Sequence, residues 1–215
     1  MPVVVLTLAS PLWRRLSVQV VGIALVATGV ALTIQAELGV APYDVVTTGL
    51  HELFDIPIGV AAVLLPLLFV AIGALLGARL GAGTALDVLL VGPVLGLVLD
   101  HLPEVDALAP RMGLYAVGFV VLTVGIVLVI VPELGAGPAE LVMLAVADKG
   151  YPLAPARTVI ELVCVAVGFA IGGQVGVGTL AFALLIGPAL RRTLTFVGYD
   201  ADLAATRSDT ASPGA

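Results

Sequence analysis

Six stretches of this 215-residue chain are apolar for close to twenty residues at a time, which indicates that they are surrounded by lipid and not by water. A helix needs about 20 apolar residues to cross the ~30 Å hydrocarbon layer of a bilayer. The stretches are Leu16–Ala36, Ile56–Ala78, Thr84–Leu102, Met112–Val131, Ala154–Gln174 and Thr179–Val197. Apolar residues make up 60% of the chain and charged residues only 11%, too few to cover a water-soluble globule. The sequence therefore predicts an all-α membrane helix bundle of about six transmembrane helices in contact with the lipid bilayer.

Two shorter segments interrupt this series of spans. Pro42–Asp55 follows the first span and Pro138–Tyr151 follows the fourth, and proline and glycine bound both. As helices they would be only ~20 Å long, too short to cross the membrane. We therefore expect two half-helices, which either re-enter the membrane or lie on its surface.

The basic residues predict the orientation, because cytoplasmic loops retain Lys and Arg. With the N-terminus in the cytoplasm, eight of the nine Lys and Arg residues, Arg79 and Arg207 among them, fall on the cytoplasmic side, and only Arg111 falls outside. The chain is thus expected in a plasma (inner) membrane as a multi-pass protein with both termini cytoplasmic.

The chain also contains an internal repeat. Glu37–Pro42 recurs 96 residues later as Glu133–Pro138, and Gly83-Thr84 recurs 95 residues later as Gly178-Thr179. An odd number of spans in each half would insert the second copy in the opposite sense, as in the inverted repeats common among secondary transporters.

The repeat defines the predicted domain organisation. Residues 1–200 form a single transmembrane domain made of two inverted three-span repeats, about 14–100 and 110–196. The polar residues 201–215 are expected to form a disordered cytoplasmic tail, because they lack the apolar surface needed for folding.

Glycines four residues apart lie along the ends of the second and fifth spans and continue just beyond them. They are predicted to form a small-residue stripe that lets helices pack closely, and the pattern does not separate a tight seam from a sliding one. These helix-packing residues are Gly73, Gly77, Gly81, Gly168, Gly172 and Gly176.

Thr84 and Thr179 open the third and sixth spans. Their hydroxyls could cap helices that begin at membrane depth. Alternatively, the two helix N-termini face a common cavity and receive an anionic or polar ligand.

Asp44 and Glu140 are equivalent acids in the first turns of the two half-helices. The helix dipole stabilises a carboxylate there, so simple capping is one interpretation. A proton- or cation-coupled gate is the other, because the repeat keeps an acid in both copies. Asp87 has no acidic counterpart in the other half.

Glu161 also lacks an acidic counterpart and would lie about 10 Å into the fifth span. An ionised group that deep costs at least ~2.5 kcal/mol, so it needs a partner or a watery cavity. Arg157, one turn earlier, is the expected partner, and a structural ion pair and a ligand or proton role both remain open. The predicted substrate or coupling residues are Pro42, Tyr43, Asp44, Thr84, Asp87, Pro138, Glu140, Arg157, Glu161 and Thr179.

The sequence does not contain the residue patterns that several other classes of function require. The only histidines, His51 and His101, do not form a zinc-binding motif, Cys164 is the only cysteine, and no serine lies inside a later span. No phosphate-binding loop is present, and a net charge of −6 without a basic stripe argues against nucleic acid. We expect no catalytic residue, cofactor or metal.

Glycine, proline and acidic positions of this chain resemble those of a known family, the YczE/YyaS/YitT group of bacterial integral membrane proteins. The resemblance extends over about residues 20–197, with Tyr43 standing where tryptophan is more usual. It rests on Gly39, Pro42, Asp44, Gly81, Ala82, Gly83, Thr84, Gly92 and Pro93. It implies a membrane protein for which transport is considered, and it assigns no substrate.

The leading functional hypothesis is a transporter or permease of an unidentified small solute, with its site between the two halves. The alternative is a non-transporting membrane partner or scaffold subunit of a transport or biosynthetic system. A homo-oligomer and a membrane or cytoplasmic partner are compatible with either hypothesis.

Overall fold

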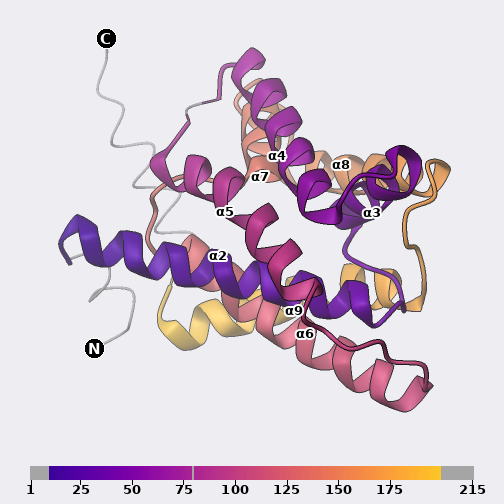
Figure 1. Cartoon of the computed structure of the whole chain (residues 1–215). Coiled ribbons are helices and arrows are strands. Elements are labelled where there is room, and N and C mark those ends of the chain that lie inside the picture. Colours follow the sequence, from indigo (N-terminus) through magenta and orange to yellow (C-terminus); the bar gives the residue numbers. More distant parts are fainter. Residues whose placement is uncertain (1–9, 79, 200–215) are drawn as a thin grey trace, which may run out of the picture.

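The computed structural model describes residues 10–78 and 80–199, and these residues form eight α-helices and no strand (Figure 1). Arg79, Arg207 and the predicted tail lie outside the described residues. The helices are α2 (Leu12–Gln35), α3 (Pro42–Phe54), α4 (Ile58–Leu75), α5 (Ala82–Leu99), α6 (Leu108–Ile130), α7 (Pro138–Ala147), α8 (Leu153–Ala170) and α9 (Val177–Val197). The all-helical membrane architecture is confirmed.

Five of these helices are long and apolar enough to cross a membrane: α2, α4, α5, α6 and α9. The half-helices α3 and α7 have 13 and 10 residues. Helix α8 has 18 residues and occupies the place of the fifth predicted span, Ala154–Gln174, whose crossing of the membrane stays a prediction. All of the predicted spans and half-helices correspond to observed helices, with bounds that differ by up to four residues.

The glycine stripe was misplaced by sequence reasoning. Gly77 and Gly172 do not lie on a helix face: they follow the ends of α4 and α8 with φ of 94° and 93°, where a side chain is unfavourable. The carbonyl of Gly73 accepts a 2.8 Å hydrogen bond from the Ala78 N–H beyond this turn, and the same bond recurs in α8. Gly81 and Gly176 precede α5 and α9.

The rare backbone conformations repeat along the chain. Glu37 and Glu133, 96 residues apart, have φ of 50° and 49°, a left-handed conformation that non-glycine residues seldom adopt. Gly39 and Gly135, two residues later in each half, also have positive φ. The loops that lead from α2 into α3 and from α6 into α7 are therefore built alike.

The helices form two groups that exchange elements between the halves (Figure 1). One group contains α3, α4, α7 and α8, in which α3 packs on α8 and α7 packs on α4. The other contains α2, α5, α6 and α9, and α5 lies between the groups because it also packs along α4. Each half-helix is thus held by a long helix of the other half.

Helices α2 and α6 cross as an antiparallel pair through glycine. A Cβ built on any of four glycines would lie within 3.0 Å of the opposite helix, so the two backbones are in close contact. Gly22 and Gly29 face Leu128 and Leu122, whereas Gly118 and Gly125 face Leu32 and Val26. Gly118 and Gly125 lie 96 residues after Gly22 and Gly29, and the leucines that face the first pair lie 96 residues after the residues that face the second pair, so the contact is reciprocal.

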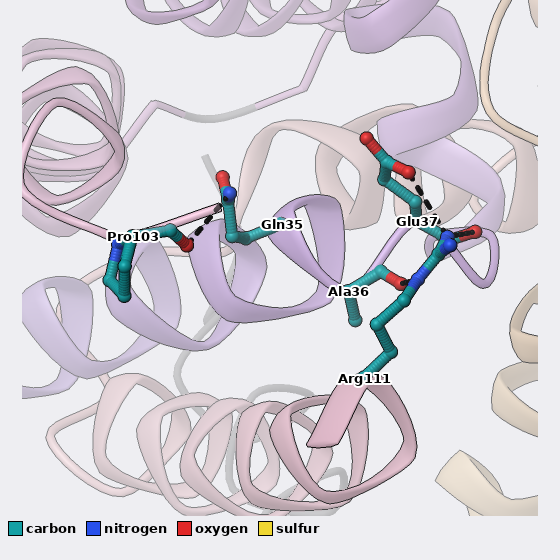
Figure 2. Close-up of polar contacts among 5 residues, drawn as sticks. All are labelled: Gln35, Ala36, Glu37, Pro103 and Arg111. Carbon is teal, nitrogen blue, oxygen red and sulfur yellow. Dashed lines mark hydrogen bonds and ion pairs between the residues drawn. The ribbon is translucent and has the colours of Figure 1, made fainter. Parts of the chain in front are cut away.

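Two arginines make a second reciprocal contact. Arg111 donates Nε–H to the Ala36 carbonyl and an Nη2–H to the Glu37 carbonyl, both at 2.7 Å, and also pairs with the Glu37 carboxylate at 3.1 Å (Figure 2). Gln35 beside them donates to the carbonyl of Pro103. The two hydrogen bonds of Arg111 satisfy carbonyls that the end of α2 leaves free.

Arg15, 96 residues before Arg111, acts in the same way on the end of α6. Its Nε–H donates to the Pro132 carbonyl at 3.0 Å, and an Nη2–H donates to the Pro132 and Glu133 carbonyls. Each half therefore supplies an arginine that holds the loop before the half-helix of the other half.

Candidate substrate site between the half-helices

Asp44 and Glu140 occupy the first turns of α3 and α7, which begin with Pro42 and Pro138. The Oε2 of Glu140 lies 2.5 Å from where a Cβ of Gly137 would be, so this carboxylate lies over the start of its helix. No hydrogen bond of either carboxylate to a helix N–H occurs within residues 10–78 and 80–199. The dipole stabilises both acids, while the hydrogen-bonded capping role is not observed.

The start of α5 is tied to the loop that leads into α7. The Gly83 N–H donates to the Leu134 carbonyl at 2.9 Å, and the Thr84 hydroxyl donates to the Ala136 carbonyl at 2.6 Å. In the other half the Gly178 N–H donates to the Leu38 carbonyl at 2.7 Å, in the loop before α3. The first turns of α5 and α7 are therefore held side by side.

This anchoring brings acids of both halves together. Asp87, one turn beyond Thr84, lies close enough to Glu140 for the two charges to interact. Tyr43 lies within electrostatic range of Asp87 and Glu140 and also of Asp44 beside it. The structure thus brings Asp87 and Glu140 near each other, with Tyr43 of α3 in electrostatic range of both and Asp44 next to Tyr43 in the sequence.

Unpaired hydroxyls lie on the same part of α3. The Tyr43 hydroxyl oxygen is buried without a hydrogen-bond partner, and the Tyr43 ring packs edge-on against Phe69 with centroids 5.2 Å apart. Thr47, one turn later, is 1% exposed and its hydroxyl is also unpaired. An unpaired buried hydroxyl costs about 1–3 kcal/mol, which a polar solute or a water could offset.

Sequence reasoning missed a buried amide beside this site. Gln19 on α2 is 0% exposed, and neither its amide oxygen nor its amide nitrogen has a hydrogen-bond partner. Its Nε2 lies 2.9 Å from the position a Cβ would take on Gly83, so it adjoins the start of α5. A lone amide within an apolar span was the available signal, and attention to charged residues passed over it.

The two threonines have different partners. The hydroxyl of Thr179 accepts the Gly176 N–H at 3.3 Å, so it satisfies a donor at the start of α9, as the capping interpretation predicts. Thr84 instead bonds across to the other half. Among the described residues, the side-chain hydrogen bond from Thr84 to the loop before α7 therefore has no identical counterpart at Thr179 of α9.

Arg157 and Glu161 form the expected ion pair on α8, with Nε and Oε1 2.8 Å apart. Their side chains are 45% and 36% exposed among the described residues, so the carboxylate is not enclosed as its depth in the sequence had suggested. Cys164, one turn further, lies within electrostatic range of both Glu161 and Asp44, so this stretch of α8 lies near the start of α3.

Two hollows of the structure lie away from the acids. A hollow of about 400 Å³ near the end of α5 is lined by Leu97, Val98, His101 and Leu102, and one of about 310 Å³ lies on apolar residues of α6. Within the described residues, no group of three His, Cys, Asp or Glu side chains is arranged to hold a metal ion.

Three known proteins similar to this chain have names that assign no activity. An uncharacterized protein of Haemophilus influenzae is 27% identical over 194 residues, which cover 88% of this chain and 89% of that protein. The uncharacterized membrane protein YczE of Bacillus subtilis is 28% identical, covering 80% of this chain and 82% of its own length. The uncharacterized protein YyaS of the same organism is 24% identical over 79% of this chain and 87% of its own length.

No solved structure matches the chain. The family model described as "Family of unknown function (DUF6198)" matches residues 13–194, nearly the whole of the helical region. With YczE and YyaS among the relatives, the resemblance drawn from the glycine and proline pattern is confirmed. The chain is a membrane protein that belongs to the DUF6198 family.

Proposed function

We propose that this protein is a secondary transporter of a small solute, coupled to protons or another cation, whose site lies where α3, α5 and α7 converge. The observation that carries the proposal is the approach of Asp87 on α5 to Glu140 at the N-terminus of the half-helix α7, with Tyr43 and Asp44 at the N-terminus of the half-helix α3 nearby. Half-helix ends at a repeat interface are where secondary transporters bind their substrates and coupling ions.

The proposal includes an inverted relation between the halves. Antiparallel packing of α2 on α6 supports it, as do the reciprocal contacts of Arg15 and Arg111. With α8 as a sixth span, the two copies cross the membrane in opposite senses, and both termini lie in the cytoplasm of a bacterial-type cell. Half-helix α3 then lies on the external side of the membrane and half-helix α7 on the cytoplasmic side.

The charges of the cluster suggest what it binds. None of Asp44, Asp87 and Glu140 forms an ion pair within the described part of the chain, and Arg157 is already paired with Glu161. Carboxylates held together away from bulk water are stable when they share a proton or a cation. The unpaired hydroxyls of Tyr43 and Thr47 would hydrogen-bond the solute.

A ligand screen tests the binding step. The unfolding midpoint of purified wild-type protein is measured against polar and cationic small molecules at several pH values, because a ligand that prefers the folded state raises it. The matched variants are Asp87→Asn with Glu140→Gln in the site, and Glu104→Gln with Asp106→Asn on exposed residues between α5 and α6. A stabilising compound should lose its effect in the site variant and keep it in the loop variant.

A flux measurement then separates transport from binding alone. The stabilising compound should enter proteoliposomes faster with wild-type protein than with the site variant, and a pH gradient should alter its rate. A compound that binds but is never moved would reject transport and favour the alternative, a substrate-capturing or scaffold subunit. Equal behaviour of the two double variants would reject the acid cluster as the site.

A further inference from the structure

The two halves differ where α5 and α9 leave their anchored starts. Gly92 on α5 is buried, and a Cβ added there would overlap the Val63 side chain and the Gly59 carbonyl oxygen of α4. Gly187, 95 residues later on α9, is exposed and would meet nothing within 4 Å. Equivalent glycines in equivalent helices therefore have opposite surroundings.

The packing of whole helices follows this difference. Helix α5 packs along α4, whereas α9 packs on α6 and makes no comparable contact with α8. Figure 1 shows α9 and α8 in separate groups, with α5 joining the groups in the first half. The seam between α4 and α5 is closed, and the seam between α8 and α9 is open.

Gly187 lowers the stability of α9 without making a contact that requires glycine. Glycine inside a helix is unfavourable relative to alanine unless something needs its missing side chain. At Gly92 the close approach of α4 supplies that need, and at Gly187 nothing in this arrangement does. Helix α8 is the element expected to pack beside Gly187, because its counterpart α4 packs beside the equivalent Gly92 in the other half.

We propose that α5 and α9 exchange these positions. In the second state α9 packs on α8 through Gly187 while α5 separates from α4 at Gly92, so one seam opens as the other closes. The α4–α5 contact lies at the start of α4 and the end of α5, which is the external side under the proposed orientation. The described state is then open towards the cytoplasm, and the exchange controls access to the acid cluster.

The residues of the two seams determine which state dominates. Ala62 on α4 is 4% exposed, but Arg157 stands at the equivalent position of α8 and is half-exposed. Gly96 on α5 likewise corresponds to Arg191 on α9. Closing the second seam would remove charged groups from water, whereas the first seam buries small apolar residues. The cytoplasm-open state is therefore the major one, and the other is a minor population.

Pulsed electron paramagnetic resonance distances on the full chain in lipid nanodiscs test the exchange. In a Cys164→Ser background, spin labels at Leu64→Cys and Leu97→Cys report the α4–α5 seam. Labels at Val159→Cys and Arg192→Cys, each 95 residues later, report the α8–α9 seam. All four sites are exposed. The matched perturbations are Gly92→Ala and Gly187→Ala, with Gly92→Leu as a stronger form of the first.

The expected result is opposite movement of the two distances. Gly92→Ala should lengthen the first distance and raise the short-distance fraction of the second by about tenfold, because overpacking penalises only the closed α4–α5 seam. Gly187→Ala should leave the major distances unchanged and deplete the minor one. A second distance that stays long while the first lengthens overturns the exchange, as does a first distance that neither Gly92 variant lengthens in folded protein. No solute is added, so the outcome is separate from the search for a transported compound.

Discussion

At the residue scale, single glycines decide whether the two halves can touch. A Cβ on Gly81 would overlap the Leu134 carbonyl oxygen, and a Cβ on Gly176 would overlap the Leu38 carbonyl oxygen. These are the same contact seen from each half, 95 to 96 residues apart. Carbonyl oxygens of the backbone cannot rotate away as a flexible side chain can, so the whole loop would have to move.

Gly81→Ala and Gly176→Ala should therefore each lower the free energy of unfolding by a similar amount, about 1–3 kcal/mol. The matched control is Gly113→Ala on α6, where a Cβ would meet nothing within 4 Å. That change should raise stability by roughly 0.5–1 kcal/mol, because alanine favours the helix. Denaturant titration of the three variants in detergent measures this, and a Gly81 variant as stable as the Gly113 variant would contradict the contact.

At the element scale, the position of α7 depends on hydrogen bonds between the start of α5 and the loop that leads into α7. The Thr84 hydroxyl bond to the Ala136 carbonyl is a side-chain tie between the start of α5 and the loop before α7. Removing the hydroxyl leaves a partly buried carbonyl without that partner. Because Glu140 follows one turn later, the position of the acid depends on this tie.

Thr84→Val should cost about 1–2 kcal/mol and speed amide hydrogen exchange in the first turn of α7. Thr28→Val on α2 is the control, since the Thr28 hydroxyl bonds only to the Ala24 carbonyl of its own helix. Hydrogen-exchange mass spectrometry compares the two. Equal exchange in α7 for both variants would show that the tie does not position the half-helix.

The elements themselves were largely predictable from the sequence. Apolar runs and the prolines at Pro42 and Pro138 marked each helix, because span length and helix starts are local properties. The glycine stripe was wrong at Gly77 and Gly172, because a glycine on a helix face and one just beyond a helix end look alike in sequence. Gly77 shows this, since its positive φ ends α4.

Long-range pairing was not predictable in the same way. Nothing local shows that Arg111 bonds to the Ala36 carbonyl, or that Asp87 lies within electrostatic range of Glu140. The repeat predicted that the halves share one plan, but not that each half-helix packs on a helix of the other half. Contacts of that kind depend on how the two copies dock, which spacing along one chain does not encode.

At the scale of the whole molecule, the proposed site requires the two halves to have opposite orientations in the membrane. The ends of the two half-helices report this directly, because Asp55 follows α3 and Lys149 follows α7, and both are exposed. If the halves are inverted, these equivalent ends lie on opposite sides of the membrane. If the halves were parallel, the half-helices would have to cross and the spans would number eight.

The measurement is cysteine labelling in intact cells with a membrane-impermeant maleimide. Asp55→Cys and Lys149→Cys are each introduced into the Cys164→Ser background. We expect Asp55→Cys to be labelled from outside, and Lys149→Cys to be labelled only after the membrane is permeabilised. Labelling of both cysteines from the same side would contradict the inverted arrangement and, with it, the proposed site between opposed half-helices.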